Sequence, residues 1–290
     1  MNEGMLETKC IDPDLLAFVH IEKAAGTTLT ELLRRSFRLR FMDVKPLSRS
    51  SNRIRAFTRS DLQKIRLLNP SVRCIAGHSI KPFILEREPL PQNIRYITLF
   101  RDPVRRYTSH YIHWVEKMGR DLSFDEFLRI EYNWNFQTKK IAGAEDPERA
   151  KGILRQCFLL VGAVEQFDEF LLFLKRKLAP WPFDPRYRIL NGANRPADIN
   201  GIIEAYRDRI VEKNRCDIEL YNFVRDGLME AERSAYGPGL AEDLAALRRQ
   251  NAIVGGPRSH WFDHLIRTYF FRGAIGLLRY AQNLPVRGTY

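Results

Sequence analysis

The chain of 290 residues contains few cysteines and no long apolar run. Its four cysteines lie far apart and form no Cys-x-x-Cys pair, so the sequence indicates neither a zinc site nor a disulfide framework. No stretch approaches the ~18 consecutive apolar residues that a membrane-spanning helix needs. The first residues, MNEGMLETKCIDPD, are polar and acidic, so we expect no secretory signal peptide and a reduced, cytoplasmic location.

Acidic side chains are in deficit, since 35 Asp and Glu accompany 47 Lys and Arg and the net charge is +12. This excess favours an anionic partner, such as a nucleotide, a nucleic acid, an acidic glycan or a lipid surface. A solvated basic face would give the same composition. Hydrophobic residues make up 44% of the chain, a value typical of globular proteins, and a chain of this length buries a core without disulfides.

Short apolar runs alternate with amphipathic segments along the chain. The runs predict strands over 15–21, 72–76, 94–100 and 158–164, and the segments predict helices over 27–39, 60–68, 103–118, 166–178, 199–211 and 216–229. This alternation predicts an α/β fold with a parallel sheet flanked by helices.

Two further segments bear on domain organisation. Residues 43–60 are basic and rich in Ser and Arg, which predicts an exposed loop. Glycine and proline within 234–259 predict loops that separate a C-terminal piece from the α/β body. We therefore expect an α/β domain over 1–233 and a helical C-terminal extension over 234–290.

The segment that joins the first strand to the first helix has the features of a phosphate cradle. Backbone N–H groups and the helix dipole attract anions at such a junction. Lys23 adds a positive charge, Thr27 and Thr28 add hydroxyl donors, and the small residues that would let an anion approach the backbone are Ala24, Ala25 and Gly26. The lysine precedes the only glycine, so this is not a Walker A loop and it implies no Mg²⁺. A surface loop with small residues for helix–strand packing would look similar.

A second group of residues follows the run 94–100. Arg101 stands at the strand end, where ligands of open α/β sheets bind, and a guanidinium suits a terminal phosphate. Ser109 lies about two helical turns further on and can face the same crevice. An ion pair with Asp102 for Arg101, and a solvated hydroxyl for Ser109, are the structural alternatives.

Together these segments resemble the nucleotide-binding motifs of sulfotransferases, in the carbohydrate branch that includes heparan sulfate 2-O-sulfotransferase. HIEKAAGTTL (20–29) resembles the 5′-phosphosulfate loop, usually HIPKTAGT[ST], and FRDPVRRYTSHY (100–111) resembles the 3′-phosphate motif RDPxxRxxSxY. Glu22 replaces the usual Pro and Ala24 the usual Thr, which we discount because both positions act mainly through the backbone. Four shorter elements follow in the family's order and extend the match over about 15–226: AGHS (76–79), NFQTKK (135–140), VGAVEQFDEF (161–170) and DIELY (217–221).

The resemblance implies a P-loop-like α/β fold and transfer of a sulfuryl group from 3′-phosphoadenosine-5′-phosphosulfate (PAPS) to a hydroxyl, with a carbohydrate as the expected acceptor. It implies that the 5′-phosphosulfate contacts Lys23, Ala24, Ala25, Gly26, Thr27 and Thr28, and that the 3′-phosphate contacts Arg101 and Ser109. His78, in the Gly-His element, is the implied general base, and Lys23 would neutralise charge on the bridging oxygen. No metal is expected, because the sequence offers no carboxylate cluster to hold one.

Other residues leave alternatives open. Glu22 and Glu165 are rival bases, although a solvated or ion-paired role suits each. His20 fits a packed or hydrogen-bonded role better than catalysis, and His110 and His113 are expected to be exposed or structural. Asn135 and Gln137 are predicted to bind the acceptor or the nucleotide, and a structural turn would explain them nearly as well. The basic segment 45–59 either grips an acidic glycan or is only solvated.

A different function class is a non-catalytic binder of nucleic acid or another polyanion, suggested by the net charge and eleven tyrosines. The basic residues are scattered and no known binding module is visible, so we expect no nucleic-acid partner. A nucleotide kinase would need a Walker A loop and a Mg²⁺-binding carboxylate. The oligomeric state cannot be predicted.

The segment 260–284 combines aromatic and basic residues at helical spacing. Packing on the body or on a second subunit is the preferred interpretation. Peripheral contact with a membrane is the alternative, because an interfacial helix has a similar composition.

Overall fold

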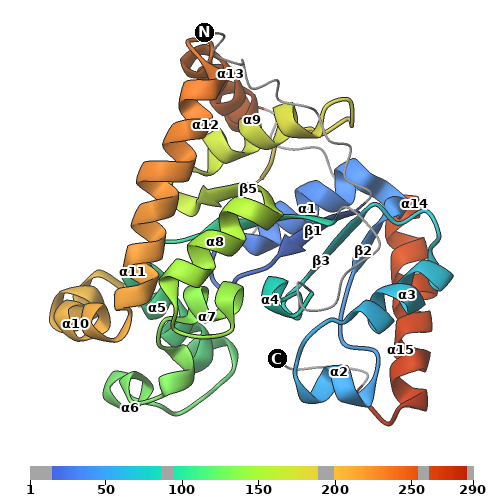
Figure 1. Cartoon of the computed structure of the whole chain (residues 1–290), viewed down its shortest axis with the longest axis horizontal. Helices are drawn as coiled ribbons and strands as arrows, with labels where there is room; N and C mark the ends of the chain where they lie inside the picture. The colour runs from blue at the N-terminus through green and yellow to red at the C-terminus, as the bar shows by residue number, and fades with distance from the viewer. Residues whose placement is uncertain (1–14, 86–93, 189–198, 254–260, 286–290) are drawn as a thin grey trace, which may run out of the picture.

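The computed structural model describes residues 15–85, 94–188, 199–253 and 261–285. Its centre is a five-stranded sheet in the order β2-β3-β1-β4-β5, in which all neighbouring strands are parallel (Figure 1). The strands are β1 (Leu15–Val19), β2 (Phe41–Asp43), β3 (Cys74–Gly77), β4 (Ile94–Phe100) and β5 (Phe158–Ala163). Their residues are almost all buried, which is why each strand is a nearly continuous apolar run. The predicted α/β class with helices around a parallel sheet is confirmed.

Helices surround this sheet and bury their apolar sides against it. Helix α1 contributes Leu29, Leu32 and Leu33 to the core, and α9 contributes Phe170 and Leu171. The helices that precede or follow strands are α1 (Gly26–Phe37), α3 (Arg59–Leu68), α4 (Pro82–Leu85), α5 (Pro103–Ile112), α8 (Pro147–Cys157) and α9 (Phe167–Leu178).

A smaller apolar cluster lies below the sheet in Figure 1, between α5 and the helices beside it. Tyr107 packs edge-on against Phe127, and Ile210 closes the cluster from α10. The remaining helices of the body are α6 (Phe124–Leu128), α7 (Phe136–Ala142), α10 (Ile199–Lys213), α11 (Arg215–Asn222) and α12 (Met229–Tyr236), the last two joined by the π-helical stretch Phe223–Leu228.

The best predicted boundary is the one between β4 and α5. The strand ends at Phe100, and Pro103 opens the helix. The Asp102 carboxylate caps this helix by accepting a hydrogen bond from the backbone N–H of Arg105 at 2.9 Å. Local sequence signals are therefore sufficient to place the end of β4 and the start of α5. Arg101 lies in the short connection between them.

The segment 43–60 differs from the predicted exposed loop. It contains the short helix α2 (Arg49–Arg53), and β2 precedes it at the sheet edge. Helix α3 is capped by Thr58, whose hydroxyl accepts from the Asp61 N–H at 3.3 Å while the Asp61 carboxylate accepts from the Thr58 backbone N–H at 3.1 Å. The same buried carboxylate accepts from the Leu47 N–H at 3.0 Å, which ties the segment to the body.

The C-terminal part is helical, as expected, and a turn lies at the predicted loop position 237–239, between α12 and α13. Helix α13 (Leu240–Ile253) follows this turn and packs against α9, where Arg248 Nε lies 3.1 Å from Asp168 Oδ2. The glycine-rich residues 255–257 lie outside the described residues. Helices α14 (Trp261–Leu265) and α15 (Arg272–Ala281), joined by the π-helical stretch Ile266–Phe271, run along the side of the molecule where β2 lies (Figure 1).

This last segment is anchored to the body by buried charged groups. Asp263 accepts from Arg38 Nε at 2.9 Å, and Arg267 donates to the carbonyl oxygens of Arg34 and Arg38 at 3.2 Å. The preferred interpretation, that this segment packs on the body, therefore holds for the face that carries Asp263 and Arg267. A division of the chain at residue 233 stays a prediction, as does the cytoplasmic location. None of the described helices combines the length and apolar character needed to cross a bilayer.

Candidate functional site

The loop between β1 and α1 turns sharply and packs closely. Lys23 and Ala25 adopt left-handed backbone conformations, with φ of 68° and 54°, which cost strain in residues other than glycine. Gly26 faces the His20 ring so closely that a Cβ there would lie 1.9 Å from His20 Nε2. The loop thus needs a glycine at this position, and it places the residues of 23–28 at the N-terminal end of the twelve-residue helix α1.

The two predicted phosphate-binding motifs meet in the fold. Because β4 lies beside β1, Arg101 reaches across and donates from Nη1 to the carbonyl oxygen of Lys23 at 3.1 Å. Gln137 holds the Arg101 backbone on the other side: its Nε2 donates to the Arg101 carbonyl, and its Oε1 accepts from the Arg101 N–H, both at 3.0 Å. Ser109 is half-buried on α5, the helix that starts two residues after Arg101.

Positive groups collect at this junction. The pKa of Lys23 is lowered, first by burial and then by Arg101 and Lys117, and no acidic side chain is among the groups that shift it. The pKa of His113 is also lowered, by burial first and then by Lys23 and Lys117. Neighbouring cations lower one another's pKa, and a bound anion would stabilise the charged form of each. Together with the end of α1 and its hydroxyls, the donor set fits a ligand with more than one phosphate or sulfate group.

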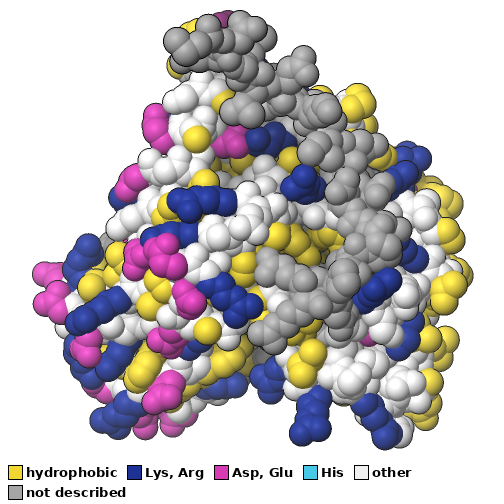
Figure 2. All heavy atoms as spheres, viewed as in Figure 1, with side chains coloured by type: hydrophobic (Ala, Val, Ile, Leu, Met, Phe, Trp, Pro, Cys, Tyr) yellow, Lys and Arg dark blue, Asp and Glu magenta, His cyan; other side chains and the backbone are white. Residues whose placement is uncertain are grey.

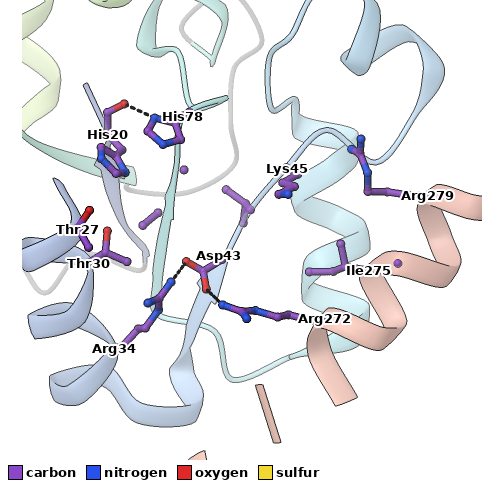
Figure 3. Close-up of a pocket in the computed structure, with 14 residues that line it drawn as sticks. His20, Thr27, Thr30, Arg34, Asp43, Lys45, His78, Arg272, Ile275 and Arg279 are labelled. Carbon is purple, nitrogen blue, oxygen red and sulfur yellow. Dashed lines mark hydrogen bonds and ion pairs between the residues drawn. The ribbon is translucent and has the colours of Figure 1, made fainter. Parts of the chain in front are cut away.

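His78 lies directly after β3, beside this loop. Its Nδ1 is 3.3 Å from Glu22 Oε1. The same nitrogen lies 3.3 Å from the carbonyl oxygen of His20 (Figure 3). The rings of His78 and His20 are stacked, with centroids 3.9 Å apart. Lys140 completes the group, because its ammonium donates to the His78 carbonyl oxygen and lies 3.7 Å from Glu22 Oε2.

The protonation states of this group follow from its surroundings. Burial alone would raise the pKa of Glu22, but Lys140 and His78 hold it below its ordinary value, so the carboxylate is charged. Burial, and then His78, lower the pKa of His20 to about 3, so this ring is neutral at pH 7. A proton on His78 Nδ1 directed at Glu22 leaves Nε2 as the basic nitrogen, and the carboxylate stabilises the imidazolium that forms when Nε2 takes a proton.

Of the roles left open for Glu22, the structure shows the ion-paired one. The replacement of the usual Pro was discounted because this loop was expected to act mainly through its backbone. The side chain instead lies between His78 and Lys140. A charged residue in place of Pro, one strand away from a candidate base, was the available signal.

Asn135 and Gln137 have their side chains engaged by the protein itself. Asn135 Oδ1 accepts from the backbone N–H groups of Cys216 and Asp217 at 3.0 and 3.3 Å, and its Nδ2 donates to Glu145 Oε2 at 2.8 Å. Gln137 uses both ends of its amide on the Arg101 backbone. These contacts favour positioning roles over direct contact with an acceptor.

The other candidate bases are placed elsewhere. Glu165 accepts from the backbone N–H of Asp102 at 3.1 Å and from the Tyr221 hydroxyl at 2.9 Å, which secures the start of α5. His110 is buried, with its ring edge-on to those of Phe127 and other aromatic residues. Burial, and then Arg106, lower the pKa of His110 to about 3.

Two cavities of about 550 and 560 Å³ adjoin His78. The first, drawn in Figure 3, extends from Thr27 and His20 to the inner face of α15, which contributes Arg272 and Arg279. The second lies on the side of Glu22 and Lys140. The residues that line both are Lys45, His78 and Arg279. His78 therefore borders two separate spaces, and α15, which no sequence motif covers, belongs to the walls of each.

Within the described ranges, no three His, Cys, Asp or Glu side chains come together in a way that would hold a metal ion. No protein-family model and no curated protein matches the chain. Among solved structures, the chain is similar to the crystal structure of a sulfotransferase from Alicyclobacillus acidocaldarius, at 15% sequence identity and a TM-score of 0.42, over 71% of this chain and 96% of that one. A likeness this distant adds nothing to the functional interpretation, which depends on the site residues.

Proposed function

We propose that this protein is a sulfotransferase that moves a sulfuryl group from PAPS to an acceptor hydroxyl on a carbohydrate. The observation that carries the proposal is the contact of Arg101 Nη1 with the Lys23 carbonyl at 3.1 Å. It joins the two motifs that resemble the family's 5′-phosphosulfate and 3′-phosphate segments, within reach of one ligand. The proposed contacts of the nucleotide are Lys23, Ala24, Ala25, Gly26, Thr27, Thr28, Arg101 and Ser109.

When bound, PAPS supplies the sulfuryl group and a phosphate that departs with negative charge. The protein's task in such a loose transition state is positioning and charge stabilisation. His78 Nε2 takes the proton of the acceptor hydroxyl, and Glu22 stabilises the resulting imidazolium. Lys23, at the positive end of α1, offsets the charge that develops on the departing phosphate.

The second cavity supports an acidic acceptor. One carboxylate, Glu22, is among the residues that line it, and Lys140 pairs with that carboxylate. The basic residues of its walls are Lys45, Arg53, Arg55, Lys81, Lys139, Lys140 and Arg279. An excess of cations next to the base favours a carbohydrate that carries carboxylate or sulfate groups. From the basic segment 45–59, Lys45 and Arg55 are therefore the residues proposed to bind the acceptor.

The proposal is tested by incubating the protein with radiolabelled PAPS and a panel of acidic glycans, neutral glycans, lipids and small alcohols. Transfer of label to an acidic glycan is the expected result. Salt-dependent binding of DNA, without binding of the product nucleotide 3′-phosphoadenosine-5′-phosphate, would instead support the polyanion-binding alternative.

A further inference from the structure

The outward side of α14–α15 carries a row of large apolar side chains. Trp261, Tyr269 and Leu277 are 69%, 77% and 71% exposed. Figure 2 shows hydrophobic side chains along the edge of the molecule where these helices lie in Figure 1. The large exposed side chains of the segment are Trp261, Phe262, Leu265, Tyr269, Phe270, Leu277 and Tyr280. We call these seven residues the aromatic face.

The aromatic face is continuous because its members follow helical spacing. Steps of three and four residues lead from Phe262 through Leu265 and Tyr269 to Gly273, and on to Leu277 and Tyr280. Gly273 interrupts the row with no side chain, and a Cβ placed there would meet no atom within 4 Å, so this position also faces outward. Single exposed apolar residues are ordinary on protein surfaces, but a row of this length marks an interaction site.

The charged residues of the same segment point the other way. Asp263, Arg267 and Arg279 are all buried against the body, together with Phe271. The Asp263 carboxylate accepts a hydrogen bond from Arg38, and Arg279 donates to the carbonyl oxygen of Pro46. The segment therefore turns its charges toward the protein and its aromatic rings outward. A helix that only covers a core would do the reverse, with apolar residues inward and charges toward solvent.

We propose that the aromatic face docks on the surface of a bilayer that contains anionic lipids. Trp and Tyr prefer the level of the lipid headgroups, where a ring meets hydrocarbon and its polar atom meets water. The only acidic residue in 261–285 is the buried Asp263, so no carboxylate on this face repels lipid phosphate.

Basic residues border the face and supply the attraction. The exposed Arg49 of α2 donates from Nε to the carbonyl oxygen of Gln282 at 2.9 Å, which fixes α2 beside the end of α15. Arg53 follows on the same short helix and is also exposed, whereas Arg272 of α15 turns inward, where its guanidinium lies 3.9 Å from Asp43 Oδ2. Arginines beside aromatic rings match the phosphates of an anionic leaflet. A second copy would bring the same arginines and no carboxylate from this segment to pair with them.

Flotation of the full chain with vesicles tests the proposal. One set of vesicles contains phosphatidylcholine alone and the other adds phosphatidylserine. The double variant Tyr269→Glu/Leu277→Glu places two charges on the face at exposed positions that the fold does not need. Ile253→Glu is the control, because Ile253 is 82% exposed on α13, away from α14 and α15 in Figure 1.

The expected result is flotation of the wild-type chain and the Ile253 variant with the anionic vesicles, and a drop of at least about tenfold in the bound fraction of the double variant. Thermal unfolding of all three proteins checks that they are equally folded. A wild-type chain that stays in solution, or a double variant that floats equally well, overturns the proposal. So does equal flotation with both kinds of vesicle, since the arginines would then play no part.

Analytical sedimentation of the protein without lipid tests the alternative that a second copy of the chain occupies the aromatic face. A wild-type dimer that the double variant converts to a monomer, with no flotation, would assign the face to a second copy and overturn membrane docking. The proposal does not depend on the sulfotransferase assignment. Binding of the product nucleotide, measured on the same samples, reports on that assignment separately.

Discussion

Glu22 Oε1 lies 3.3 Å from His78 Nδ1, although the two residues come from different strand ends of the sheet. The contact orients the imidazole and selects which nitrogen acts as a base. It also places a charged carboxylate where a protonated His78 needs a partner. Lys140 keeps that carboxylate ionised from the other side. The proposed chemistry therefore depends on a group of three residues.

Replacement of His78 by Ala should lower turnover ~10²- to 10⁴-fold, because the acceptor hydroxyl loses its general base. The affinity for the product nucleotide, measured by calorimetry, should stay at the wild-type value, since His78 is not among its proposed contacts. Full activity of the variant with the true acceptor would assign the base to another residue.

Replacement of Glu22 by Gln should lower turnover about 10- to 100-fold, because a hydrogen bond to a charged group is worth roughly 1.5–3 kcal/mol. The nucleotide affinity should again be unchanged. The variant leaves the buried Lys140 without its charged partner, which could lower stability by itself. The control is therefore the double variant Glu22→Gln/Lys140→Met, which removes both charges. If this double variant regains stability and also regains turnover, then Glu22 matters only for folding.

Replacement of Arg101 by Ala should weaken binding of the product nucleotide by ~2–5 kcal/mol, as expected when one partner of a shielded charge pair is lost. Arg129→Ala, at an exposed position after α6, serves as the control for the loss of one arginine. Gln137→Ala should have a smaller effect, because it only releases the Arg101 backbone. Titration calorimetry that finds wild-type affinity in the Arg101 variant would count against the assigned 3′-phosphate contact.

Catalysis should not need a metal ion. Lys23 and the N-terminal end of α1 supply the positive charge that Mg²⁺ supplies in phosphoryl-transfer enzymes. Initial rates measured with and without EDTA should agree. A complete loss of activity in EDTA that added Mg²⁺ restores would refute this prediction.

Acid should destabilise the protein through His110. Burial lowers the pKa of this residue from 6.5 to about 3, so below pH 6.5 the unfolded chain binds a proton that the folded chain excludes. The resulting loss in the free energy of unfolding is about 2 kcal/mol at pH 5 and continues to grow as the pH falls toward 3. His110→Leu should reduce the slope of stability between pH 5 and 6.5 by about one proton, as measured by urea unfolding. An unchanged slope would show that His110 titrates normally.

The sequence predicts four of the five strands and the tight turn before α1 well because their signals are local. Asp102 and Pro103 mark the end of β4 and the start of α5 within a few residues. The small residues around Gly26 indicate a close approach, which the structure explains by the position of the His20 ring. Signals of this kind need no knowledge of the rest of the fold.

The missed elements lack such local signals. Strand β2 has only three residues, too few to show a period of two. Helix α13 lies between the glycines and prolines of 237–239 and 255–257, which predict loops but do not indicate the helix between them. In the same way, the replacement of Pro by Glu22 acquires its meaning only when α7 brings Lys140 beside β3.

The part of α15 in the site could not be predicted, because the motifs end near residue 226. Arg272 and Arg279 reach the cavities through tertiary packing of a segment that also exposes the aromatic face. Composition alone supported both packing on the body and membrane contact. The structure shows that one side of this segment packs on the body, and membrane contact by the other side is the proposal made above.

We propose that the loop at Lys23 and the strand end at Arg101 hold PAPS next to His78. Transfer of label from radiolabelled PAPS to an acidic glycan, by the wild-type protein and the His78→Ala variant side by side, tests it most directly. We expect labelled glycan with the wild-type protein and a rate at least ~10²-fold lower with the variant, at equal nucleotide affinity. A wild-type protein that neither binds 3′-phosphoadenosine-5′-phosphate nor labels any acceptor in the panel would contradict it.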